Sequence, residues 1–268
     1  CKTLAQSFLK SLARKCADRY QQSSVSVYSS HCRKNQQRAA SIRHLLNTSA
    51  SASNLAMRYL ALLVVATAHA ADVCSNTQAI DGQQFPDWIK SGGSTRQLTG
   101  GGTRYKYGVA KVYALGLYID EGVASGALSK FAGKEGKQLA ADQKFHDAVI
   151  TGKFGKTLLL QFHRAVGGEK VAEALKDSLS DKLDAKTLEA FKDKLFGVIS
   201  NGVNKGTKLY FECSGGDVGI SVDSLKAQAK APATVCDALL KTYYGKAPVS
   251  AQAKEGMAHG FAALAAAA

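Results

Sequence analysis

Apolar and polar positions alternate most densely between Gly100 and Asp120, where β-branched, aromatic and glycine residues predominate. This period of two predicts two strands joined by a tight turn. With Gly108-Val109 as a two-residue type II′ turn, Arg104 lies directly opposite Tyr113. The pattern therefore places a guanidinium and a phenol on one sheet face, among apolar neighbours.

The same periods predict further elements along the chain. Lys156–His163 alternates as a strand with most of both faces buried, and a second hairpin turns at Ser214–Asp217. The strands of that hairpin are 207–213 and 218–222. Helices are predicted over 168–179, 186–201, 234–245 and from near Ser250 through Phe261. Asp184 is the expected N-cap of the second helix, and a capping box at Thr234 is expected to open the third. Residues 122–150 are expected to be helical and polar, and 71–99 to form an extended arm.

Strands and helices are thus segregated rather than strictly alternating along the chain. Such segregation predicts an α+β fold, a large antiparallel sheet with helices packed on one face.

The chain before this region has a different character. Residues 57–70 combine a positive residue, a short apolar run and an Ala-x-Ala ending, which predicts a secretory signal peptide cleaved after Ala70. The run is too short to span a membrane. Residues 1–56 are expected to be an unstructured leader outside the mature protein, with a basic organelle-targeting presequence as the alternative. The folded domain is then 71–268, in a secreted or lumenal protein.

Charge and cysteine content narrow the functional classes. The chain carries a formal charge of +14, but residues 71–268 carry only +5, with lysines scattered among acids. We therefore expect no nucleic-acid partner. Cys74, Cys213 and Cys236 remain after cleavage; the last two either form a disulfide or are buried thiols. Cys/His spacing predicts no metal site, and the sequence predicts no cofactor.

The predicted pair, Arg104 and Tyr113, has two interpretations. In one, Arg104 extends past the sheet edge into solvent while Tyr113 fills the core. In the other, both donate hydrogen bonds to the carboxylate of a ligand whose apolar remainder lies along the sheet. His163 is expected to be structural, and packing is expected to explain Tyr243 and Tyr244.

Several stretches, taken in order, resemble the chalcone isomerase superfamily. They are the Gly-x-x-x-Arg ending at Arg104 followed by Lys111-Val-Tyr-Ala-Leu-Gly-Leu-Tyr118, then 156–163, Glu169-Lys-Val171, 205–211 and 239–245. The resemblance covers roughly 100–263. It implies an antiparallel sheet backed by helices, with an apolar ligand cleft between them.

The resemblance also implies which groups an active isomerase would need. Active plant members use an Arg, a Thr, a Tyr and an Asn, whose positions fall on Arg104, Tyr113, Gly167 and Ala174. Arg96 is a nearby alternative for the Arg. Three of the four groups are absent, and Arg with Tyr instead resembles the non-catalytic branch that binds fatty acids.

These observations lead to three functional hypotheses. The first is non-catalytic binding of a fatty acid or similar amphiphilic carboxylate by Arg104 and Tyr113. The second is an intramolecular lyase of the chalcone-to-flavanone type, acting on an unknown enone with the same two residues as oxyanion donors. The third is an accessory protein that binds another enzyme.

Overall fold

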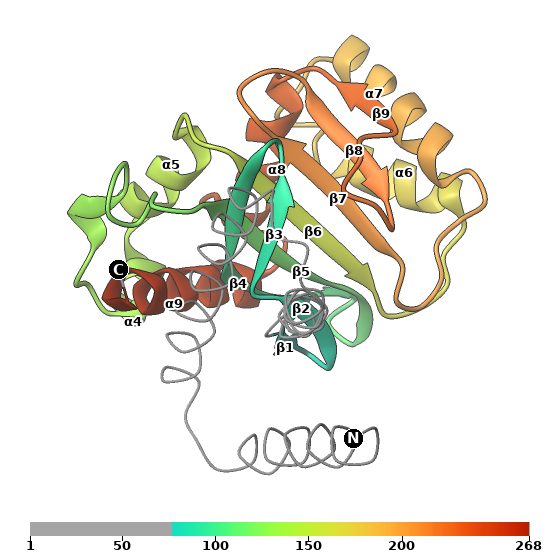
Figure 1. Cartoon of the computed structure of the whole chain (residues 1–268). Helices are drawn as coiled ribbons and strands as arrows, with labels where there is room; N and C mark the ends of the chain where they lie inside the picture. The colour runs from blue at the N-terminus through green and yellow to red at the C-terminus, as the bar shows by residue number, and fades with distance from the viewer. Residues whose placement is uncertain (1–76, 268) are drawn as a thin grey trace, which may run out of the picture. The chain divides into compact units, whose positions relative to one another are not determined.

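The structure, a computed structural model, describes residues 77–267 and contains a seven-stranded antiparallel sheet of order β3-β4-β5-β6-β7-β8-β9 (Figure 1). Its strands are β3 (Trp88–Ser91), β4 (Ser94–Lys106), β5 (Ala110–Asp120), β6 (Lys156–Phe162), β7 (Lys208–Cys213), β8 (Val218–Val222) and β9 (Ala229–Ala231). A separate hairpin joins β1 (Thr77–Ile80) and β2 (Gln83–Pro86). The predicted leader, the signal peptide and Cys74 lie outside the described residues.

The helices pack on one face of this sheet, which confirms the predicted α+β class. They are α4 (Gly136–Ala141), α5 (Gln143–Thr151), α6 (Gly168–Asp177), α7 (Ala185–Ile199), α8 (Thr234–Tyr244) and α9 (Ala251–Ala267), with a 3-10 turn at Ser129–Phe131. Figure 1 shows α6 and α7 beside β7–β9, and α4 and α9 at the β4 side. Leu115, Leu160 and Phe211 from the sheet share one core with Phe191 and Phe261 from the helices. Burial of this apolar surface is the main stabilising contribution to the fold.

A smaller apolar cluster lies on the opposite face. Phe85 and Ile89 come from β2 and β3, and they pack against Leu98, Tyr118 and Leu159 of the sheet. The N-terminal strands therefore cover part of the face that carries no helix.

The prediction of an extended arm over 71–99 was wrong for the part that is described. Residues 77–99 form β1, β2, β3 and the start of β4. Both connecting turns have positive φ at two successive residues, 50° and 77° at Asp81-Gly82 and 61° and 81° at Gly92-Gly93. Asp-Gly and Gly-Gly pairs favour tight hairpin turns, so the local signal was present.

The β4–β5 turn also differs from its prediction. Lys106 pairs with Ala110, which leaves the three residues 107–109 in the loop rather than the predicted two. A bulge between Arg104 and Tyr105 then adds one residue to the β5 side. The two differences compensate, and Arg104 does pair with Tyr113 as predicted.

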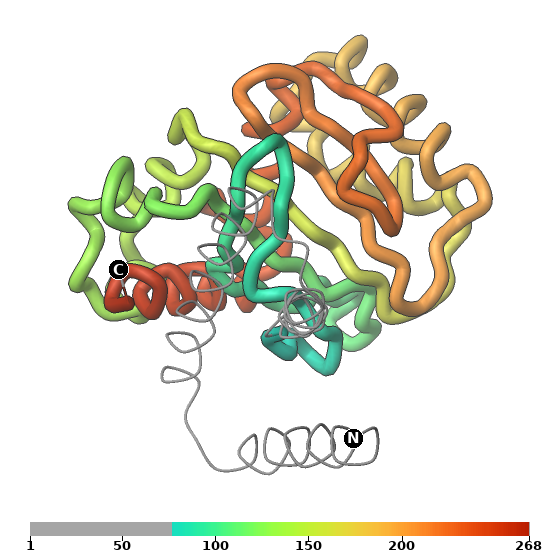
Figure 2. Tube along the Cα trace, viewed as in Figure 1, coloured from blue at the N-terminus to red at the C-terminus, as the bar shows by residue number. Residues whose placement is uncertain are grey.

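A second bulge in β4, between Leu98 and Gly101, coincides with a close approach of α9. The backbone of Gly100 has a φ of 103°, and a Cβ there would lie 2.3 Å from the Gly256 carbonyl oxygen. Conversely, a Cβ on Gly260 would overlap the carbonyl of Thr99. The backbone of α9 therefore packs directly on the backbone of β4, and Figure 2 shows the two traces side by side.

Of the disulfide and the two helix caps considered for the C-terminal half, the disulfide and one cap are present. A disulfide joins Cys213 at the end of β7 to Cys236 in the first turn of α8. The Asp184 side chain caps α7 by accepting from the Thr187 amide at 2.9 Å. Thr234 forms no capping box, because α8 begins at Thr234 itself and its N-cap, Ala233, has no side-chain acceptor.

Candidate functional site

The predicted pair lies near the end of the hairpin formed by β4 and β5. Directly opposed residues of antiparallel strands point to the same face, so Arg104 and Tyr113 both face the helices. Tyr113 is only 8% exposed, whereas Arg104 is half-buried. The pair therefore spans the boundary between the apolar core and solvent.

The phenol of Tyr113 is held by aromatic neighbours from two elements. Its ring packs edge-on against Phe162 of β6 and Tyr243 of α8, with centroid separations of 5.5 Å and 6.5 Å. Its hydroxyl lies 2.7 Å from the Tyr243 hydroxyl, in a hydrogen bond that either oxygen can donate. The two phenols thus connect the hairpin to the C-terminal end of α8.

Both phenols are neutral at physiological pH. Burial raises the pKa of Tyr113 above its ordinary value of 10.0, and the Tyr243 hydrogen bond and the Arg104 guanidinium oppose this shift only in part. Burial and the neighbouring Tyr113 raise the pKa of Tyr243 well above 10.0. Each hydroxyl therefore retains its proton; one proton forms the bond between the two phenols, and the other can be donated to an anion.

The Arg104 guanidinium has unused hydrogen-bond donors. Within residues 77–267 its side chain makes one hydrogen bond, from Nη1 to the Tyr105 carbonyl oxygen, and no carboxylate lies within 4.0 Å of it. A guanidinium carries five N–H donors in a planar fork. An anionic ligand beside Tyr113 can therefore be bound by two of them at once.

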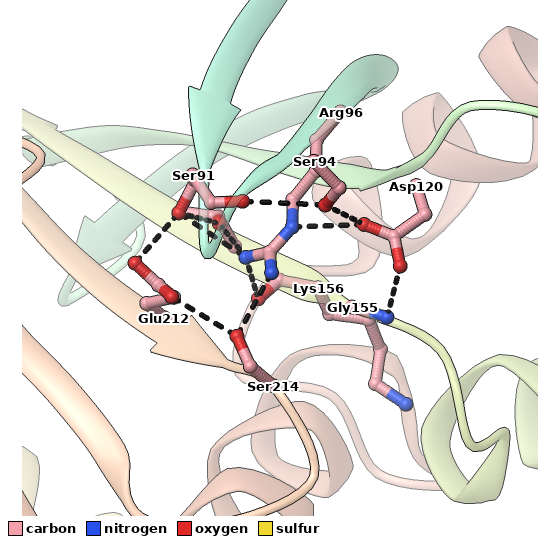
Figure 3. A network of polar contacts seen from close by, with 9 residues as sticks. Ser91, Ser94, Arg96, Asp120, Gly155, Lys156, Glu212 and Ser214 are labelled. Atoms are coloured by element: carbon pink, nitrogen blue, oxygen red, sulfur yellow. Dashed lines mark hydrogen bonds and ion pairs between the residues drawn. The ribbon is translucent and has the colours of Figure 1, made fainter.

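Arg96, the alternative candidate, has a different environment (Figure 3). It is 1% exposed, its Nε lies 3.1 Å from Asp120 Oδ1, and Nη1 donates to Thr157 Oγ1 at 2.6 Å. Its other nitrogen, Nη2, donates to Ser214 Oγ at 2.9 Å. Because its donors are used within the protein, Arg96 ties strands together on the face opposite Tyr113.

The counterparts of the plant Tyr and Asn offer no side-chain donors. Gly167 is the exposed N-cap of α6, and Ala174 lies inside that helix. Nothing at these positions replaces the missing hydroxyl and amide.

His163 belongs to a separate polar cluster under the β1–β2 turn. Its Nε2 lies 3.3 Å from Asp81 Oδ2, and its Nδ1 lies 3.2 Å from Gln83 Nε2. Asp81 also accepts from Thr103 at 2.9 Å. Burial lowers the pKa of His163, and the cluster anchors the N-terminal hairpin to the sheet, in agreement with the structural role expected for this histidine.

Tyr243 is the site residue that sequence analysis missed, having attributed it to packing. All of the last residues of α8, from Thr242 to Tyr244, are buried, so helical periodicity gives no signal that singles out one of them. The neighbouring Tyr244 hydroxyl is also buried but has no hydrogen-bond partner among the described residues. Only tertiary structure distinguishes the two tyrosines.

The space predicted for a ligand is occupied by side chains next to Tyr113. Phe162 and Tyr243 are at most 1% exposed, and both contact the Tyr113 ring. An acyl chain entering beside Tyr113 must therefore displace at least one aromatic side chain. The contact most easily exchanged is the hydroxyl–hydroxyl hydrogen bond, because a ligand oxygen can replace it.

Comparisons with known proteins agree on the family and the fold. The family model of chalcone-flavanone isomerase matches residues 80–264. A chalcone–flavanone isomerase of Oryza sativa is 29% identical over 212 residues, which cover 67% of this chain and 86% of that protein. A chalcone–flavanone isomerase of Gossypium hirsutum is also 29% identical, over 65% of this chain and 85% of that protein. A chalcone isomerase-like protein 2 of Humulus lupulus is 32% identical over 29% of this chain and 37% of that protein.

A solved structure shares the fold at lower sequence identity. The fatty-acid binding protein of Arabidopsis thaliana superimposes with a TM-score of 0.55 at 21% identity, covering 71% of this chain and 99% of that one. At this identity the likeness concerns the fold alone.

Proposed function

This chain belongs to the chalcone-flavanone isomerase family, and from that premise we propose that it binds a fatty acid or a similar amphiphilic carboxylate without catalysing a reaction. Arg104 and Tyr113 bind the carboxylate in this proposal. The observation that carries it is their pairing at the edge of the core, where a guanidinium with spare donors faces a buried, neutral phenol.

The chemistry of the pair suits a carboxylate. The planar fork of Arg104 offers two parallel N–H groups to the two carboxylate oxygens, and the Tyr113 hydroxyl adds a third donor. A hydrogen bond from Tyr243 to the Tyr113 oxygen would direct the Tyr113 proton toward the ligand. Charge-assisted hydrogen bonds of this kind are stronger where solvent is partly excluded.

The apolar remainder of the ligand needs an apolar surface. Leu115, Leu160 and Phe162 extend from Tyr113 along the helix-facing side of the sheet. A solved protein with this fold is named as a fatty-acid binding protein, which supports the choice of ligand class. Binding then requires the aromatic side chains around Tyr113 to open.

A second candidate is ring closure of an enone by the same residues. Two relatives of this chain are named chalcone–flavanone isomerases, and a neutral phenol pair beside a guanidinium can donate to a developing enolate. Against it, Gly167 and Ala174 replace the hydroxyl and amide that the plant enzymes use. We therefore rank catalysis second.

Two measurements on the full chain separate the candidates. Native mass spectrometry after gentle purification should show a co-purified acyl chain, which is lost in Arg104→Ala. Chalcone turnover should be absent. A ligand-free spectrum without fatty-acid affinity would contradict the binding proposal, whereas turnover that disappears in Tyr113→Phe would support the isomerase.

A further inference from the structure

The β4–β5 hairpin protrudes beyond its neighbouring strand. Pairing of β5 with β6 ends at Tyr113 and Phe162, whereas β4 and β5 stay paired as far as Lys106 and Ala110. At about 3.4 Å per residue, the turn therefore extends roughly 10 Å past the end of β6.

This turn presents two large apolar side chains to solvent. Tyr107 is 85% exposed and Val109 is 81% exposed, the highest values among the large exposed hydrophobic residues of the described region. Tyr107 also has a φ of 55°, a conformation that Gly or Asn adopts at lower cost than a bulky residue. Neither burial nor backbone geometry favours tyrosine here, which points to an external contact.

Cations accompany the apolar tip. Lys106 Nζ lies 5.1 Å from the centroid of the Tyr107 ring. The nearest acid on the adjoining hairpin, Asp81, is already paired with Lys111 at 2.6 Å. Lys106 therefore faces solvent beside the tip without a neutralising partner within 4.0 Å among the described residues.

Two more exposed cations lie beside the base of the hairpin. The backbone N–H of the residue before Arg164 donates to the Val112 carbonyl oxygen at 2.9 Å. The backbone N–H of the residue after Lys205 donates to the Phe162 carbonyl oxygen at 2.8 Å. Both Arg164 and Lys205 are exposed. Exposed cations thus lie next to the protruding apolar turn.

We propose that this tip docks on the surface of an anionic phospholipid membrane. Tyr107 and Val109 enter the interface, and Lys106, Arg164 and Lys205 lie against the lipid headgroups. Tyrosine suits the bilayer interface because its ring is apolar and its hydroxyl stays hydrated. A two-residue tip is too small for a stable protein interface, which buries about 800 Å² per partner.

The contact is peripheral in this proposal. None of the described helices has the length and apolarity to cross a bilayer. The proposal rests on the tip and on the cations beside it, and it does not depend on the identity of the ligand at Arg104.

A tryptophan at the tip tests the contact in the full chain. Tyr107→Trp should show a blue-shifted emission, relative to the native Trp88 signal, with vesicles of phosphatidylcholine and phosphatidylserine but not of phosphatidylcholine alone. High salt should reverse the shift. Phe196→Trp, an exposed aromatic position on α7, is the matched control and should not respond. Equal responses at both positions, or none at Tyr107→Trp, would overturn the proposal.

Binding variants give an independent measure. The double variant Tyr107→Asn, Val109→Ser should weaken vesicle binding about tenfold, because it removes both apolar side chains of the tip. Asparagine is chosen at position 107 because it tolerates the positive φ. Lys106→Ala should weaken it about fivefold, since one cation near an anionic surface contributes ~1 kcal/mol. Melting temperatures should not fall, and Tyr107→Asn can raise its own slightly by relieving the positive φ. Unchanged vesicle binding in these variants, or a tip tryptophan that responds to polyglutamate but not to vesicles, would assign the tip to another role.

Discussion

Arg96 and Arg104 lie on the same strand, yet their side chains have different surroundings. Arg96 is enclosed by acceptors from Asp120, Thr157 and Ser214, so its charge is neutralised inside the protein. Arg104 is half-buried and keeps free donors beside Tyr113. Residue type alone does not distinguish the two arginines; the number of acceptors around each one does, and the unused donors of Arg104 are what the proposed carboxylate site requires.

The Arg96 network predicts a pH dependence of stability. Burial raises the pKa of Asp120, but hydrogen bonds from Ser94, Gly155 and Arg96 outweigh burial and hold the pKa below its ordinary 3.8. A carboxyl with a lowered folded-state pKa stabilises the fold above about pH 4, and that contribution is lost as pH falls through the folded-state pKa. Asp120→Asn should therefore cost about 1–3 kcal/mol at neutral pH and much less in acid.

Denaturant titrations at several pH values measure this effect. Asp217→Asn, an exposed position in the β7–β8 turn, is the control and should leave the curve unchanged. A constant difference between wild type and Asp120→Asn down to the lowest pH would refute the assignment.

The two adjacent tyrosines of α8 predict opposite behaviour. Tyr243→Phe removes the partner of the Tyr113 hydroxyl and should cost about 1–2 kcal/mol of unfolding free energy. Tyr244→Phe removes a buried hydroxyl without a partner among the described residues and should be neutral or slightly stabilising. Thermal melts of the two variants compare them directly, and equal losses would contradict the special contribution assigned to the phenol pair.

At the scale of elements, the bulge in β4 determines where Arg104 points. Leu98 faces the small cluster on the helix-free side, and strict alternation would place Arg104 on that side as well. The extra residue between Leu98 and Gly101 reverses the alternation, so that Arg104 faces the helices opposite Tyr113. The run Gly100–Gly102 thus orients the site and at the same time admits α9.

This contact predicts contrasting effects of glycine substitutions in two helices. A Cβ on Gly256 of α9 would lie 2.0 Å from the Gly101 carbonyl oxygen, so Gly256→Ala should destabilise the fold by about 1–3 kcal/mol. A Cβ on Gly197 of α7 meets nothing within 4 Å, so Gly197→Ala should stabilise it by about 0.5–1 kcal/mol. Chemical denaturation would measure both, and a loss in Gly197→Ala as large as in Gly256→Ala would contradict this account.

Sequence predicted the elements whose signals are local. Period-two alternation identified β5 and β6, and Asp184 marked the start of α7, because pattern and capping act within a few residues. The strands before β4 were missed although the Asp81-Gly82 and Gly92-Gly93 turns signalled them. The bulge and the role of Tyr243 depend on contacts between distant segments, which no local pattern contains.

At the scale of the whole molecule, the disulfide bears on where the protein folds. Cys213 and Cys236 are bonded, and disulfides persist in oxidising compartments. This supports the proposal that residues 57–70 direct the chain into the secretory pathway and that cleavage follows Ala70. Intact mass and N-terminal sequencing of the protein from its source would test the cleavage.

Removing the disulfide should weaken the fold. The bond closes a loop with a sequence separation of 23 residues. The loss of loop constraint in the unfolded chain predicts a cost of about 2–4 kcal/mol for the double Cys213→Ala, Cys236→Ala variant. Reduction of wild type by dithiothreitol should match the variant, and stability that reduction leaves unchanged would contradict the bond.

The central claim, that Arg104 binds a carboxylate, is tested most directly by calorimetric titration with a medium-chain fatty acid. Arg104→Ala should lose about 2–4 kcal/mol of affinity, because a charged partner would remain partly buried and unpaired, and Arg104→Lys should recover only part. Arg164→Ala, an exposed arginine beside the same hairpin, should bind as wild type does, and all melting temperatures should stay close. Equal affinities in wild type and Arg104→Ala would contradict the claim.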